Sequence, residues 1–200
     1  MSSENRRVVV AGGSGFIGRA LGRALLARGY RVVALTRGPS RSPTVAPDGA
    51  TPTFATWDAR TTAGWGHLAD GAFALVDLTG EGIAGGRWTP ERKRAILESR
   101  VFAGQAMAKA VAEAAKKPEV YVQASGVGYY GDTGDKPVDE SSPPGQGFLT
   151  DVCLQWEASS QSVENLGVRR VIIRSGLVLG RGGGVLEKML PAFGVATRMS

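Results

Sequence analysis

The feature that most constrains the fold is an apolar run that ends in glycines and continues as a helical pattern. The run covers residues 8–10, and Gly12, Gly15 and Gly18 follow it. Glycines at such positions let a chain turn sharply off a strand, bring its backbone close to a ligand and pack the next helix against the sheet. The free N–H groups and the helix dipole of such a turn attract anions. The sequence therefore predicts a phosphate-binding turn between a strand and a helix.

The flanking sequence favours a dinucleotide site over a merely tight connection. Residues 19–28 carry apolar side chains at helical spacing and stop at Gly29, and residues 30–35 are typical of a second strand. The spacing G-x-x-G-x-x-G is a variant of the dinucleotide fingerprint, which requires this order of strand, loop, helix and strand.

The end of the second strand favours NADP over NAD. Thr36 and Arg37 stand where NAD-selective sites carry an acidic residue that bonds the ribose. A carboxylate would repel a 2′-phosphate, whereas a guanidinium pairs with it bidentately. The alternative is that Arg37 is an ordinary surface arginine in a loop rich in proline and serine.

Further strands and helices alternate along the chain. We expect strands at residues 53–58, 72–78, 119–125 and 168–174, and helices at residues 89–117, 148–165 and 185–192. The long helix starts with a Thr89 cap and Pro90, and a kink within it is possible. Asp58 either touches the adenine or caps a turn. The pattern predicts an α/β fold, a doubly wound parallel sheet of the NAD(P)-binding Rossmann type, over residues 1–193, followed by a tail at residues 194–200.

The charge pattern does not indicate nucleic-acid binding. The net charge is +6, but the basic residues are scattered. Their densest cluster, residues 92–94, is interleaved with Glu91 and Glu98 and is typical of a solvated helix face.

Composition also bears on compartment and metals. Cys153 is the single cysteine, which excludes an internal disulfide and fits a reducing compartment. The polar N-terminus and the lack of an apolar stretch of about 20 residues predict no leader and no membrane span, so we expect a cytoplasmic protein. His67 has no Cys or His partner nearby in the sequence, and we predict no metal site.

Four segments together resemble the extended short-chain dehydrogenases/reductases of the NAD-dependent epimerase/dehydratase superfamily. They are residues 12–18, 77–81, 125–131 and 173–184, and with residues 87–100 they look like the atypical NADP-binding, epimerase-like subgroup. The likeness extends from residue 7 to about residue 190. The glycine turn and the resemblance together imply these cofactor-binding residues: Gly12, Ser14, Gly15, Phe16, Ile17, Gly18, Thr36, Arg37, Leu78, Thr79, Gly80 and Arg100.

The chain departs from the resembled family at the catalytic centre. Family members normally carry a Tyr-x-x-x-Lys pair on the helix after the fifth strand. When Glu157 is aligned with the acid that often follows that lysine, Leu149 and Cys153 occupy the two positions. Leucine carries no proton, and a thiolate would repel cofactor phosphates. Cys153 is expected to be a small buried apolar residue.

The candidate catalytic residues that remain are Ser125, Tyr129 and Tyr130. Ser125 is expected to polarise a carbonyl, while the tyrosines either donate a proton or pack over the crevice. We expect no cation beside them, so their pKa would stay near ~10 and they would be poor bases.

Two functions stay open at this point. One is an oxidoreductase or epimerase-like enzyme that exchanges hydride between NADP and a carbonyl or sugar-like small molecule. The other is a non-catalytic NADP(H)-binding sensor or interaction module. No oligomeric state is predicted.

The resembled proteins continue beyond Leu190 into a substrate domain, so we expect the C-terminal substrate region to be truncated. The loss would expose a sheet edge or apolar surface and would impair catalysis more than cofactor binding.

Overall fold

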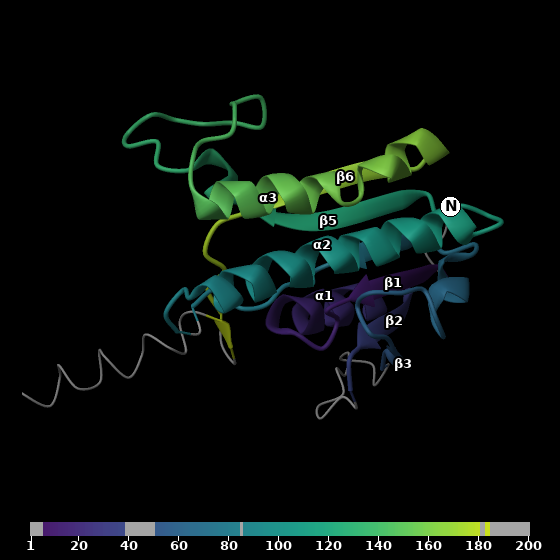
Figure 1. Cartoon of the computed structure of the whole chain (residues 1–200). Coiled ribbons are helices and arrows are strands. Elements are labelled where there is room, and N and C mark those ends of the chain that lie inside the picture. The colour runs from purple at the N-terminus through teal and green to yellow at the C-terminus, as the bar shows by residue number, and fades with distance from the viewer. Residues whose placement is uncertain (1–5, 39–50, 85, 181–182, 185–200) are drawn as a thin grey trace, which may run out of the picture.

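A single parallel sheet organises the computed structural model, which describes residues 6–38, 51–84, 86–180 and 183–184 (Figure 1). The strands are β1 (Arg7–Ala11), β2 (Arg31–Thr36), β3 (Thr53–Thr56), β4 (Ala74–Asp77), β5 (Val120–Gly126) and β6 (Arg169–Ser175). They lie in the order β3-β2-β1-β4-β5-β6. The order reverses between β1 and β4, which is where such sheets bind ligands. The predicted doubly wound fold is confirmed.

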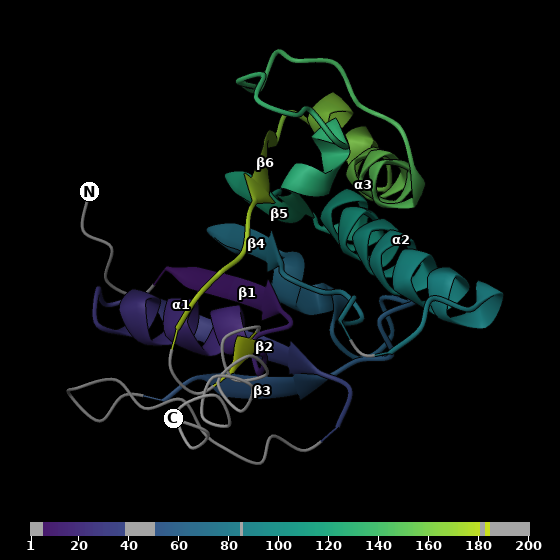
Figure 2. The same ribbon diagram turned by 90° about the vertical axis from the view of Figure 1, so that its left-hand side faces the viewer.

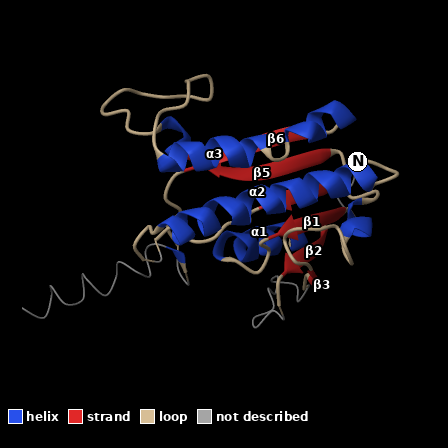
Figure 3. Cartoon of the chain, in the orientation of Figure 1, coloured by secondary structure: helices blue, strands red, loops and turns tan. Residues whose placement is uncertain are grey.

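Helices cover the two faces of the sheet unequally. α1 (Phe16–Leu26) lies on one face, and α2 (Pro90–Glu113) and α3 (Phe148–Ala158) lie on the other (Figure 2). Short 3₁₀ helices are η1 (Gly66–Ala69), η2 (Val127–Tyr130) and η3 (Gln161–Leu166). Figure 3 shows how helices and strands alternate. In β1, Val9 and Ala11 enter the core under α2, whereas Val8 and Val10 face α1. Both faces of β1 are buried, which explains why its sequence is a continuous apolar run.

The glycine turn brings α1 unusually close to the end of β1. Gly12 has a φ of +75°, a conformation that favours glycine. A Cβ atom at Gly18 would lie 2.2 Å from the carbonyl oxygen of Gly12, so only glycine fits there. Gly13, which the sequence analysis did not single out, is equally confined, because its Cβ would lie 2.6 Å from that of Ala34 on β2.

The two later helices end earlier than predicted. α2 is one continuous helix, and the Thr89 hydroxyl accepts from the backbone N–H of Arg92 at 3.3 Å, as expected of a cap. It ends at Glu113, and Lys117 Nζ donates to the carbonyls of Ala112 at 2.8 Å and Ala114 at 2.7 Å. The lysine thus satisfies carbonyls that a helix end leaves open.

The predicted helix over residues 148–165 was wrong in its second half. α3 stops at Ala158, and η3 follows as a separate turn. Ser159 Oγ donates to the carbonyl of Trp156 at 2.6 Å, and Ser160 Oγ donates to the side chain of Gln123. Serine side chains that bond nearby backbone or tertiary partners compete with helix continuation.

Apolar side chains remain exposed on and beyond the last strand. Ile173 of β6 is 49% exposed, and Leu177 and Leu179 after it are 77% and 63% exposed. Ile173 belongs to the face of β6 that points away from α3. The expectation that a truncated substrate region exposes apolar surface stays a prediction. The predicted helix at residues 185–192 and the tail lie outside the described residues.

None of the helices among the described residues is long and apolar enough to cross a membrane.

The close packing at Gly18 predicts that one added methyl group destabilises the protein. Gly18→Ala should lower the free energy of unfolding by about 1–3 kcal/mol, because the new Cβ meets backbone atoms that cannot move independently. Urea denaturation measures the change. Gly82→Ala, where no heavy atom lies within 4 Å of the added Cβ, should stay near the parent value. Equal stability of the two variants would contradict the packing argument.

Candidate functional site

Two cavities open side by side at the carboxyl end of the sheet. The first encloses about 440 Å³ between the glycine turn, the end of β2 and α2. The second encloses about 480 Å³ between β4, β5, α2 and α3. Leu78, Thr79 and Gly80, directly after β4, line both cavities. The two spaces therefore meet at the point where the strand order reverses.

Most of the predicted cofactor residues line these cavities. Gly12, Ser14, Gly15, Thr36 and Arg37 line the first, Ile17 and Arg100 line the second, and Leu78, Thr79 and Gly80 line both. The other two, Gly18 and Phe16, are not among the described residues that line either cavity. Gly18 is buried under the turn, and the ring of Phe16 lies against Gly180, Gly183 and Gly184.

Arg37 places its guanidinium at the end of β2, in the lining of the first cavity. Arg37 is exposed at the first cavity, and among the described residues it has no hydrogen-bond or ion-pair partner. Arg37 lies within a tight turn in which Thr36 Oγ1 donates to the carbonyl of Gly38 at 2.6 Å. The side chain is therefore available to an anionic group.

A second arginine in the first cavity was missed by the sequence analysis. Arg60 stacks over the ring of Phe102 at 4.3 Å and lies 3.8 Å from the Glu98 carboxylate. These partners come from α2, so only the folded chain brings them to the loop after β3.

Asp58 lines the first cavity but is occupied by its own turn. Its Oδ1 accepts from the backbone N–H groups of Arg60 and Thr61, both at 2.8 Å. These hydrogen bonds lower its pKa. The structure thus shows the Asp58 side chain in the turn-capping role.

The loop after β4 is fastened to α2. Arg100 donates to the carbonyl of Glu81 at 3.0 Å, and Ser99 Oγ accepts from the Glu81 N–H at 2.9 Å. Arg92 pairs with the Glu81 carboxylate at 2.9 Å. A Cβ on Gly80 would lie 2.8 Å from the guanidinium carbon of Arg100, so the absence of a side chain allows this contact.

Arg100 is a largely buried cation at the second cavity. Its guanidinium lies 4.9 Å from the ring centre of Trp156. Burial lowers its pKa, while Cys153, Glu81 and Asp77 act in the opposite direction. No carboxylate of the described residues lies within ion-pair distance of it, so the guanidinium can still form an ion pair with an anionic ligand group.

Asp77 lies fully buried beneath the shared loop. Its Oδ1 accepts from the N–H of Thr79 at 2.9 Å and from the Thr79 hydroxyl, while Oδ2 has no hydrogen-bond partner among the described residues. Burial raises the pKa of Asp77 to about 6, against these hydrogen bonds and the charge of Arg100. The carboxyl orients the residue that lines both cavities.

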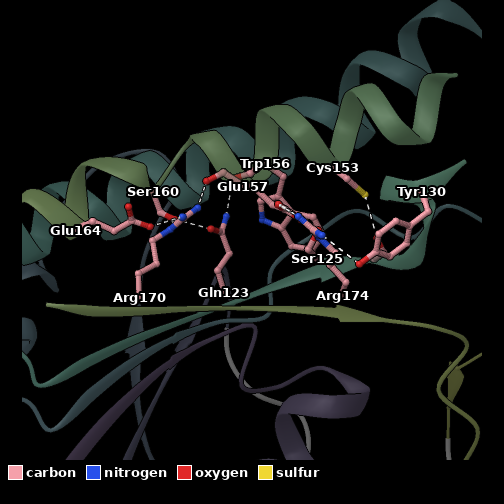
Figure 4. Close-up of polar contacts among 11 residues, drawn as sticks. Gln123, Ser125, Tyr130, Cys153, Trp156, Glu157, Ser160, Glu164, Arg170 and Arg174 are labelled. Carbon is pink, nitrogen blue, oxygen red and sulfur yellow. Dashed lines mark hydrogen bonds and ion pairs between the residues drawn. The ribbon is translucent and has the colours of Figure 1, made fainter. Parts of the chain in front are cut away.

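A layer of polar side chains connects β5 and β6 with α3 (Figure 4). Ser125 Oγ donates to Glu157 Oε1 at 2.6 Å. Arg174 donates to the two oxygens of the same carboxylate at 2.9 and 2.8 Å. Its third nitrogen donates to the Tyr130 hydroxyl at 3.1 Å. The expectation of no cation beside the tyrosines was therefore wrong, because β6 places Arg174 there.

Neither tyrosine is among the described residues that line the second cavity. Tyr129 stacks on the Arg174 guanidinium at 3.4 Å, and Tyr130 is buried. This arrangement agrees with the packing alternative, whereas Ser125 does line the cavity. A catalytic role for either tyrosine stays a prediction.

The positions aligned with the family's tyrosine and lysine both line the second cavity. Leu149 and Cys153 occupy them on α3. Cys153 is buried, as expected, and its thiol donates to the carbonyl of Gly126 at 3.6 Å. Burial raises the pKa of this thiol. Leu149 contributes no proton donor to the cavity.

Within the described residues, no group of three or more His, Cys, Asp or Glu side chains could hold a metal ion.

Comparison with known proteins shows which family this chain matches. The NAD dependent epimerase/dehydratase family matches residues 8–194. Epimerase family protein SDR39U1 of Bos taurus is 37% identical over 190 residues, 94% of this chain and 59% of that protein. Epimerase family protein Mb2239 of Mycobacterium bovis is 36% identical over 191 residues, 96% of this chain and 60% of that protein. The chain thus spans about three fifths of the length of these relatives.

Solved structures show the same fold. The crystal structure of human epimerase family protein SDR39U1 (isoform 2) with NADPH matches with a TM-score of 0.78 at 36% identity, over 94% of this chain and 59% of that chain. A nucleoside-diphosphate sugar epimerase from Corynebacterium glutamicum matches with a TM-score of 0.73 at 33% identity, over 94% of this chain and 38% of that chain.

The buried carboxyl under the shared loop predicts a pH-dependent effect of Asp77→Asn. The folded pKa of about 6 lies above the ordinary 3.8, so ionisation of Asp77 costs stability as pH rises between these values. The variant should match the parent near pH 4 and exceed its free energy of unfolding by on the order of 3 kcal/mol at pH 7.

Urea denaturation from pH 4 to pH 7 measures this difference. Asp135→Asn, at an exposed loop position, serves as the control and should show no such trend. A constant difference between Asp77→Asn and the parent over this range would contradict the assignment.

Proposed function

Because this chain belongs to the NAD-dependent epimerase/dehydratase family, we propose that it binds NADP(H) across the two cavities and exchanges hydride with a small carbonyl or alcohol. The observation that carries the proposal is that the cavities meet at Leu78, Thr79 and Gly80, where the strand order reverses. An extended dinucleotide can occupy both spaces at once.

The residues of the first cavity fit the adenosine and diphosphate half of NADP(H). The confined glycines allow the diphosphate to approach the backbone at the start of α1. Arg37, which has no ion-pair partner among the described residues, offers its guanidinium to a 2′-phosphate. The human relative that was crystallised with NADPH supports this choice of cofactor.

The second cavity fits the nicotinamide and a substrate. Its lining is mainly apolar, with Ile17, Leu149 and Val152 among the residues that would exclude water. Bound NADP(H) supplies or accepts the hydride, and Ser125 would hold the substrate oxygen. These features favour an oxidoreductase or epimerase-like activity, and the single cysteine favours a reducing compartment such as the cytoplasm.

A second candidate function is NADP(H) binding without turnover, as in a sensor or interaction module. The observation that favours it is the pair Leu149 and Cys153, which leaves the cavity without the family's usual tyrosine and lysine. An assay of NADPH turnover distinguishes the enzyme from the binding module.

Cofactor choice is expected to depend on Arg37. Arg37→Ala should weaken NADPH binding by about 10- to 100-fold, because a charge-assisted bidentate contact is lost, and should leave NADH binding unchanged. Calorimetric titration of both cofactors measures this. Arg23→Ala, an exposed arginine on α1, should bind NADPH like the parent. If Arg60→Ala abolished the preference and Arg37→Ala did not, the phosphate site would belong to Arg60.

Hydride exchange is expected to depend on Ser125. The protein should exchange hydride between NADP(H) and at least one member of a panel of small alcohols and carbonyls, and Ser125→Ala should lower that rate roughly tenfold. The change in NADPH absorbance follows the reaction. Undiminished turnover in the double variant Ser125→Ala with Tyr130→Phe would refute this residue assignment. Tight NADPH binding without turnover on any alcohol or carbonyl would favour the binding module.

A further inference from the structure

The Glu157 carboxylate is held in one orientation by a half-buried ion pair with Arg174. Arg174 donates to both of its oxygens, and the exposed fractions of the Arg174 and Glu157 side chains are only 18% and 14%. The Tyr129 ring lies against the other side of the guanidinium at 3.4 Å. Burial raises the pKa of Glu157, but hydrogen bonds from Arg174 and Ser125 outweigh it and hold the pKa below its usual value. Glu157 is therefore ionised at neutral pH.

An ionised carboxylate can only accept hydrogen bonds. Ser125 Oγ lies 2.6 Å from Glu157 Oε1, so the single hydroxyl proton of Ser125 is committed to Glu157. The Cys153 thiol on α3 donates to the carbonyl of Gly126 at 3.6 Å. What Ser125 can offer to a molecule in the cavity is therefore an oxygen lone pair.

We propose that Glu157 is a positioning residue that makes Ser125 a hydrogen-bond acceptor, so that the second cavity selects a ligand presenting a hydroxyl proton. An alcohol meets this requirement and the matching ketone does not. Arg100 can donate to the oxygen of either compound and does not separate them. The inference reverses the expected role of Ser125 as a donor to a carbonyl. It deepens the proposed function by naming the hydroxyl form as the preferred substrate.

In the parent protein, a ketone oxygen placed at Ser125 would face another lone pair and gain no hydrogen bond from Ser125. If the ion pair is replaced by apolar side chains, the hydroxyl of Ser125 is free to rotate and donate. The double variant Glu157→Leu with Arg174→Met makes this change without leaving a lone buried charge, a replacement that proteins often tolerate.

The test uses cyclohexanol and cyclohexanone, two rings small enough for a cavity of about 480 Å³. Each is titrated into the cofactor-free protein, in which no hydride can be exchanged, and amide chemical shifts at Ser125 and Gly126 report binding at the site. The parent should bind the alcohol about fivefold or more tightly than the ketone. Ser125→Ala should bind both probes equally by losing affinity for the alcohol. The double variant should instead gain affinity for the ketone.

A matched control removes an exposed ion pair elsewhere on the chain. Lys109→Met with Glu113→Leu, a pair on α2, should keep the parent's preference. The inference fails if the parent prefers the ketone, binds neither probe, or keeps its preference in Ser125→Ala or in the ion-pair variant. Because no cofactor is present, this outcome is separate from that of the proposed function, which fails if NADPH does not bind.

Discussion

The close contact between the start of α1 and the end of β1 is the constraint on which the rest of the site depends. Because Gly18 has no side chain, the helix can begin almost in contact with the Gly12 carbonyl. A Cβ atom at Gly18 would lie only 2.2 Å from the carbonyl oxygen. The same contact holds α1 to the central strand and leaves its first N–H groups open. One steric requirement thus shapes both the fold and the anion site.

Features set by local backbone chemistry could be predicted from the sequence. The glycine turn, the Thr89 cap and the order of strands and helices belong to this class, since each depends on residues a few positions apart. The end of α3 could not, because Ser160 leaves the helical pattern to bond Gln123 on a neighbouring strand. The contact of Glu157 with Arg174 spans 17 residues and depends on where α3 lies over β6. Arg60 was missed for the same reason.

β6 carries two arginines on the side where a core would ordinarily be apolar. Arg170 and Arg174 share the face under α3, while Ile173 points to the opposite face. Arg170 donates to Ser160 Oγ at 2.9 Å and to Glu164 at 2.8 Å, so the charges under α3 are paired (Figure 4). A slip of one residue in the register would place apolar side chains against these acceptors. The polar layer therefore helps to define one alignment of β6.

The loop after β4 is held by three side chains of α2, which bond Glu81 through its N–H, its carbonyl and its carboxylate. A loop fastened in this way loses its conformational entropy when the chain folds and not when a ligand arrives. A ligand in either cavity then meets a wall that is already formed, and less of its contact energy is offset by ordering. Such preorganisation shows mainly as slow dissociation.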